Sequence, residues 1–138
     1  MAVKNIILGN INAEPLGTDF LSTTLNFTGP FNVTSNATIS KLGNICVMTI
    51  TGVYGVPTAT GVDVFAPLPQ GYYPNSDAGM LVYLTTSNGT TVTSSSLGNL
   101  AASSAANSII FHSFAGWDTT SGFTQGLHNS ATLIYILA

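Results

Sequence analysis

The stretch that decides the fold is residues 39–52, which read ISKLGNICVMTITG. Gly43 and Asn44 stand between two runs that are rich in apolar and β-branched side chains. Glycine and asparagine suit the backbone angles of a tight hairpin turn, and β-branched residues favour extended strands. We therefore expect two antiparallel strands, at residues 37–41 and 45–51, that are joined by a turn at residues 42–44.

The same pattern continues along the chain. Apolar runs rich in Val, Ile, Thr, Tyr and Phe, bounded by Gly, Asn, Ser and Pro, predict further strands at residues 3–8, 31–34, 62–66, 80–85, 90–94, 108–114 and 131–137. Asn88-Gly89 predicts a type I′ hairpin turn. The best helix candidate, residues 100–106, is short and contains two serines. The prolines at 67, 69 and 74 exclude a central strand between them. The sequence thus predicts an all-β fold, an antiparallel β-sandwich of jelly-roll type.

The charge content is unusually low. Only 5% of the residues are charged, and the cations are Lys4 and Lys41, with no arginine, whereas about 25% is typical of globular domains. The chain holds 19 Thr, 14 Ser and 12 Asn, which must provide most of its polar surface. Because charged residues are depleted at the cores of interfaces, we expect identical subunits to cover part of the apolar surface.

Two classes of partner are excluded by the same composition. Nucleic acid binding needs clustered Lys and Arg to contact phosphates, and two distant lysines do not supply them. Membrane insertion by a helix needs about 18 consecutive apolar residues, and no stretch approaches that length despite a mean hydropathy of +0.40. Residues 1–8 also lack the features of a signal peptide.

Three segments resemble the C-terminal head domains of bacteriophage tail fibres and receptor-binding proteins. Residues 39–52 resemble the opening hairpin of those domains, and residues 94–102 (SSSLGNLAA) resemble a later strand with a Gly-Asn turn. Residues 66–76 (APLPQGYYPNS) resemble their Leu-Pro-x-Gly-Tyr-Arg-Pro motif, with Tyr73 where arginine is usual. The Tyr73 substitution puts in doubt the contact that the arginine makes.

The resemblance covers about residues 36–138. It implies a homotrimeric β-sandwich head at the tip of a virion fibre, which binds a host cell-surface glycan or protein. Residues 1–35 lie outside it, and we expect them to form an N-terminal attachment or shaft-like segment that contacts other virion proteins.

Four residues are candidates for ligand contact. Tyr72 and Tyr73 stand between prolines in a rigid loop, where tyrosine is a favourable contact residue at low entropy cost. Trp117 and Asp118 follow Gly116 in a loop-like stretch, where an indole face and a carboxylate would suit a sugar. The alternative is that Tyr72 packs on the core and fixes its turn, and that Trp117 fills one end of the sandwich or an interface.

No pattern points to catalysis, a metal or a cofactor. There is no Gly-x-Ser-x-Gly elbow, and no serine stands in an obvious oxyanion context. His112 and His128 are 16 residues apart and form no ligand motif. The single cysteine, Cys46, lies among apolar residues and is expected to be a buried thiol. We expect a protein that is not an enzyme.

Three functions remain open at this point. The leading one is a phage virion fibre or spike head that mediates host attachment. The second is a capsid head fibre or decoration protein with a structural role. The third is a lectin-like cellular adhesin domain.

Overall fold

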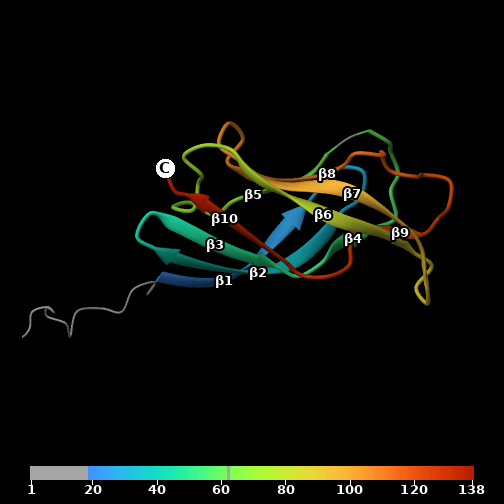
Figure 1. Cartoon of the computed structure of the whole chain (residues 1–138), viewed down its shortest axis with the longest axis horizontal. Coiled ribbons are helices and arrows are strands. Elements are labelled where there is room, and N and C mark those ends of the chain that lie inside the picture. The colour runs from blue at the N-terminus through green and yellow to red at the C-terminus, as the bar shows by residue number, and fades with distance from the viewer. Residues whose placement is uncertain (1–18, 62) are drawn as a thin grey trace, which may run out of the picture.

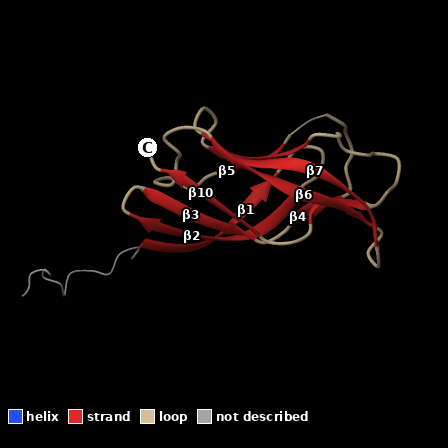
Figure 2. Ribbon diagram, in the orientation of Figure 1, coloured by secondary structure: helices blue, strands red, loops and turns tan. Residues whose placement is uncertain are grey.

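The computed structural model of the chain describes residues 19–61 and 63–138, and its regular secondary structure there is all β-strand (Figure 2). In chain order the strands are β1 (Asp19–Phe27), β2 (Val33–Leu42), β3 (Ile45–Ile50), β4 (Val53–Gly55), β5 (Val64–Pro67), β6 (Ala78–Ser87), β7 (Val92–Ser103), β8 (Ser108–Ser113), β9 (Thr124–Leu127) and β10 (Ala131–Ile136). In this part of the chain no helix is long and apolar enough to cross a membrane.

The strands form two antiparallel sheets that face each other as layers (Figure 1). The first sheet has the order β1-β2-β3-β10, and the second has the order β4-β9-β6-β7-β8-β5. The chain passes between the sheets after β3 and again before β10, so the first sheet combines the three N-terminal strands with the C-terminal strand. The predicted all-β antiparallel sandwich is therefore confirmed.

The hairpin predicted at residues 39–52 is present as β2 and β3. Leu42 pairs with Ile45, which leaves a two-residue loop of Gly43 and Asn44. Gly43 has a φ of +63° and Asn44 does not have a positive φ. A positive φ at the first loop position only is the pattern of a type II′ turn, which favours glycine there.

The core lies between the facing sides of the two sheets. Its largest fully buried side chains include Leu25, Phe27, Ile39, Met48, Ile50, Leu100, Ile109 and Phe111. Burial of each such side chain contributes about 1.5–3 kcal/mol. Cys46 is buried among them, and this burial raises the pKa of its thiol, as expected for an unreactive cysteine.

The C-terminal strand β10 pairs with β3 along its whole length. Its burial alternates, however. Leu133 and Tyr135 face the core, whereas Ile134 and Ile136 face outward and are exposed. Within a single copy of the chain, the apolar side chains of β10 are therefore buried on one face only.

Residues 100–106 do not form the candidate helix. Strand β7 continues to Ser103, because Leu100 and Ala102 alternate with outward positions and are completely buried. A turn follows, in which the Asp77 carboxylate accepts hydrogen bonds from the Ser104 amide at 2.7 Å and the Ser104 hydroxyl at 2.8 Å. Burial on the sheet thus outweighs the helix propensity of alanine.

The turn at Asn88-Gly89 closes the hairpin between β6 and β7, but it is not type I′. Its loop has four residues, and only Gly89 has a positive φ, of +91°. The Asn88 side chain accepts hydrogen bonds from the amides of Thr90 and Thr91, both at 2.9 Å. These bonds stabilise a longer Asx-type loop, a conformation that competes with the two-residue turn.

Several elements differ from the sequence expectations in extent. Strands β1, β4 and β9 were not expected, and the strand expected at 3–8 lies outside the described residues. The boundary expected after residue 35 falls within β2, and β1 pairs with β2 throughout. Residues 19–35 thus belong to the sandwich, and the attachment role of the preceding residues stays a prediction.

Native protein is expected to resist trypsin at Lys41 for hours. Lys41 lies in β2, paired with both Asp19 and Cys46, and its Nζ sits 4.5 Å from the centroid of the Tyr72 ring. Cleavage requires local opening, which is rare for backbone held in a packed sheet. Mass spectrometry of a timed digest measures this, with urea-unfolded chain as the control that should be cut at once. Rapid native cleavage after Lys41 would contradict the β2–β3 pairing.

Candidate binding surface

The outward side of the first sheet carries a row of hydroxyl groups. Ser22 of β1 pairs with Thr38 of β2, Thr38 pairs with Thr49 of β3, and Thr49 pairs with Thr132 of β10. Strand alternation turns all four side chains to the same face, away from the core. The Thr49 and Thr132 hydroxyls are hydrogen-bonded at 2.9 Å. This row offers donors and acceptors without formal charge.

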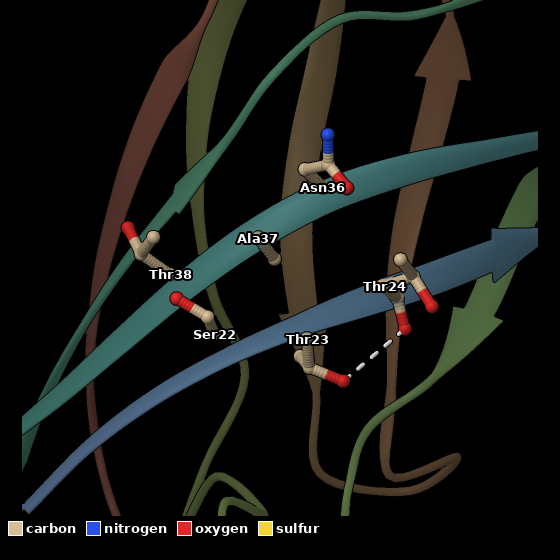
Figure 3. Close-up of a pocket in the computed structure, with 6 residues that line it drawn as sticks. All are labelled: Ser22, Thr23, Thr24, Asn36, Ala37 and Thr38. Atoms are coloured by element: carbon tan, nitrogen blue, oxygen red, sulfur yellow. Dashed lines mark hydrogen bonds between the residues drawn. The ribbon is translucent and has the colours of Figure 1, made fainter.

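A first hollow of about 460 Å³ lies over the paired strands β1 and β2 (Figure 3). It is lined by Ser22, Thr23, Thr24, Asn36, Ala37 and Thr38. The Thr23 hydroxyl donates to the Thr24 carbonyl at 3.5 Å, which is a weak bond. The hydroxyls of Ser22, Thr24 and Thr38 and the side-chain amide of Asn36 make no hydrogen bond within the described part of the chain. These groups are free to bind water or a ligand.

A second hollow of about 370 Å³ adjoins the first, because Asn36 lines both. It lies between β2 and the segment that leads into β4, and is lined by Val33, Thr34, Ser35, Asn36, Thr51, Gly52, Tyr54 and His128. The Ser35 hydroxyl donates to the Gly52 carbonyl and so ties the two walls together. We call the two hollows together the polar groove.

Tyr54 is the aromatic side chain of the polar groove, and it is 43% exposed. Its ring stacks on the His128 imidazole, with 4.3 Å between the ring centroids and an angle of 20°. His128 is hydrogen-bonded through Nδ1 to the Thr85 hydroxyl at 2.6 Å and through Nε2 to the Thr124 hydroxyl at 3.2 Å. Burial lowers the pKa of His128, which favours its neutral imidazole. The imidazole thereby supports the tyrosine ring without adding charge.

Tyr72, the first residue expected to contact a ligand, holds its own loop to the core. Lys41 lies over its ring, and the Tyr135 hydroxyl donates to its carbonyl at 2.7 Å. The neighbouring backbone is fixed as well, because Ala138 donates to the Tyr73 carbonyl at 2.9 Å. Both tyrosines are half-buried against the core. This geometry fits the expectation that Tyr72 anchors its turn, and a ligand role for Tyr72 or Tyr73 stays a prediction.

Replacing Tyr135 with Phe is expected to lower the free energy of unfolding by about 1–2 kcal/mol. The change removes the bond to the Tyr72 carbonyl and leaves this acceptor without its donor. Urea unfolding of the two proteins measures the difference. Tyr73→Phe serves as the control, since the Tyr73 hydroxyl makes no hydrogen bond in the described residues. Equal stability of Tyr135→Phe and the parent would show that the loop is held by other contacts.

Trp117 does not provide the exposed platform that was expected. It is only 3% exposed, and its ring packs edge-on against Phe31, with 5.2 Å between centroids, and against Phe111 at 5.8 Å. It is part of the buried core, together with Phe31 and Phe111. Because the indole is almost completely buried, neither of its faces is accessible to a sugar.

Asp118 is exposed, but its carboxylate is engaged locally. It accepts hydrogen bonds from the Thr120 hydroxyl at 2.7 Å and the Thr120 amide at 2.8 Å, and these bonds lower the pKa of Asp118. A third hollow of about 240 Å³ is lined by Trp117, Asp118 and Gln125 among others, and by neither Tyr72 nor Tyr73. The structure therefore does not bring the four expected residues into one site.

His112 is also paired, through Nδ1 with the Asp63 carboxylate, and it lies on the second sheet. In the described residues no three His, Cys, Asp or Glu side chains gather as a metal would require. None of the residues that line the polar groove was among the ligand contacts expected from the sequence. One sequence feature could have identified Tyr54 as a contact residue. It lies between two glycines, at residues 52–55, directly after a buried strand.

The outward side of the second sheet carries several exposed large apolar side chains. Leu81 and Tyr83 of β6 are 64% and 72% exposed, and Leu97 pairs with Tyr83 across the sheet. Phe65 of the edge strand β5 and Phe114 beyond β8 extend the same surface. We call these five residues the apolar face. Asn99 and His112 lie on the same side of the sheet, between Leu81 and the edge strand β5, so polar side chains interrupt the apolar face.

The fold places this chain among the antiparallel β-sandwiches, with one sheet of four strands and one of six. No family model matches the sequence, and no curated protein matches it. Among solved structures, the chain is similar to the reovirus attachment protein sigma1, determined in complex with alpha-2,3-sialyllactose. The TM-score is 0.57 at 11% sequence identity, over 86% of this chain and 64% of that chain. This likeness shows a shared fold, and the chain spans less than two thirds of the reovirus protein's length in that structure.

Proposed function

We propose that the chain is the head of a virion surface protein that attaches the virus to its host cell. The observation that carries this proposal is the fold, which is shared over most of the chain with a viral attachment protein. Two surfaces support it. The polar groove offers a neutral binding site, and the apolar face offers a place for symmetric assembly.

A bacteriophage tail fibre is the particular setting that we propose, and the virion surface is the corresponding location. The segment at residues 66–76 carries this step, because it resembles a motif of phage fibre heads. The structure gives a physical role to two of its residues. Gly71 has a φ of +89°, and Tyr72 anchors the loop to Lys41 and Tyr135. The proposed action is recognition without catalysis.

Assembly as a homotrimer is part of the proposal. The apolar face would lie against copies of the same chain, because a single copy exposes several large apolar side chains on one sheet. The outward Ile134 and Ile136 of the first sheet add further apolar surface. With a formal net charge of only −3, identical copies repel each other weakly. Symmetric association would remove these side chains from water.

Labelling of virus particles tests the proposed location. Fab fragments raised against the purified 138-residue protein should label surface projections of the virus that encodes it, as seen by electron microscopy. Fab bound to the virus should also block its adsorption to host cells. Labelling of the capsid without a block of adsorption would favour the structural decoration role instead. Absence of labelling on intact particles would overturn the proposed location.

A further inference from the structure

We infer that the polar groove binds a neutral sugar, whose ring lies against Tyr54 and whose hydroxyls bond to the Asn36 amide and the neighbouring threonines. This inference rests on the proposed attachment function and names the ligand class and the site. The second hollow combines an exposed aromatic ring with an uncharged polar wall. Concave sites that bind small ligands combine apolar or aromatic surface with a few directed polar groups in this way.

The chemistry of the groove matches the two sides of a sugar. The rings of hexoses have an apolar face of C–H groups, which packs on an aromatic ring, and a rim of hydroxyls, which both donate and accept. Asn36 can donate and accept at once, and threonine hydroxyls can do the same. The Asn36 side-chain amide and the Thr24 and Thr38 hydroxyls are not used by other hydrogen bonds in the described residues. A ligand can therefore bind them without breaking contacts of the fold.

The groove is also held in its shape without a ligand. His128 covers one side of the Tyr54 ring and is itself fixed by Thr85 and Thr124. Gly52 has a φ of +45°, and a Cβ there would come within 3.1 Å of Tyr54 Cε1. A side chain at residue 52 would thus crowd the ring. A pre-formed site loses less entropy when its ligand binds.

The uncharged lining of the groove points to a neutral sugar rather than an acidic one. The described residues that line it include no Asp, Glu, Lys or Arg. Lys41, the lysine of the described part of the chain, lies over Tyr72 and lines neither hollow. A carboxylate on the sugar would find no cation there to form a charge-assisted bond. The reovirus structure contains a sialylated sugar, so the two proteins would differ in this preference.

Binding to an array of neutral oligosaccharides tests the inference, with lactose and alpha-2,3-sialyllactose as a paired comparison. The purified protein should bind neutral sugars, and binding should change little between low and high salt because few charges take part. Tyr54→Ala and Asn36→Ala should each weaken binding at least about tenfold, as expected for residues at the centre of a contact. Phe123→Ala and Asn75→Ala are the matched controls, since both residues are exposed and lie outside the groove. Thermal unfolding should show all four variants folded.

Three results would overturn the inference. They are full binding by both groove variants, binding by the parent only to the sialylated member of the pair, and no binding by the parent to any neutral sugar. If the parent binds no sugar but still blocks adsorption of the virus, the groove inference is wrong and the attachment function stands. If it does neither, both are wrong.

Discussion

Replacing Tyr83 with Lys is expected to convert the proposed trimer of about 43 kDa, three times 14.2 kDa, into a monomer. Tyr83 is the most exposed large apolar residue of the apolar face, at 72%. In a symmetric trimer each copy would bury one added ammonium group with no partner, at a cost of several kcal/mol per charge. Because the side chain is exposed in a single copy, the fold itself should not be affected.

Light scattering at micromolar concentration measures this mass. Thr119→Lys is the matched control, because it adds the same charge at an exposed loop position outside both the polar groove and the apolar face. The control should remain a trimer. A parent protein near 14 kDa at micromolar concentration would contradict assembly. If the Tyr83→Lys protein stays trimeric, the trimer interface must lie elsewhere than on the apolar face.

Replacing Gly126 with Ala is expected to lower the free energy of unfolding by about 3 kcal/mol or more. Gly126 has a φ of +135°, which side chains rarely adopt, and it pairs with Tyr54 across β4 and β9. A Cβ there would lie 2.2 Å from the Val53 carbonyl oxygen and 2.9 Å from the Tyr54 Cα. The backbone of β4 would have to move, which would also displace the tyrosine of the polar groove.

Gly122→Ala is the matched control for this change. Gly122 also has a positive φ, of +69°, but a Cβ there would meet no atom within 4 Å. The Gly122→Ala change should cost only about 1–2 kcal/mol, from the backbone conformation alone. Urea unfolding of the three proteins gives the comparison. Equal losses in the free energy of unfolding for the two variants would show that β4 and β9 do not approach each other so closely.

The parts of the fold that follow from local patterns could be predicted from the sequence. The hairpin β2–β3 combines a two-residue turn with strands of regular alternation, so residues 39–52 contain nearly all the information that it needs. Strands β4 and β9 have three and four residues and include glycines. They exist because they pair with each other, and sequence periodicity carries no signal for such distant pairing.

The candidate binding surface was harder to predict for the same reason. Trp117 follows a glycine in a loop and has the appearance of an exposed residue, yet Phe31 and Phe111 from distant parts of the chain cover it. Tyr54 gains its support from His128, which lies far along the chain. The sequence alone indicates which residue types favour ligand contact. It does not indicate which of these residues the folded sheets bring together.

Competition for the host surface tests the central claim most directly. Purified protein is added to host cells before the virus that encodes it, and unadsorbed virus is counted. We expect a dose-dependent loss of adsorption, with a weaker effect for Tyr83→Lys because a monomer loses the avidity of three linked heads. Adsorption that stays unchanged at saturating protein, with folded protein confirmed in the same sample, would contradict the proposed role in attachment.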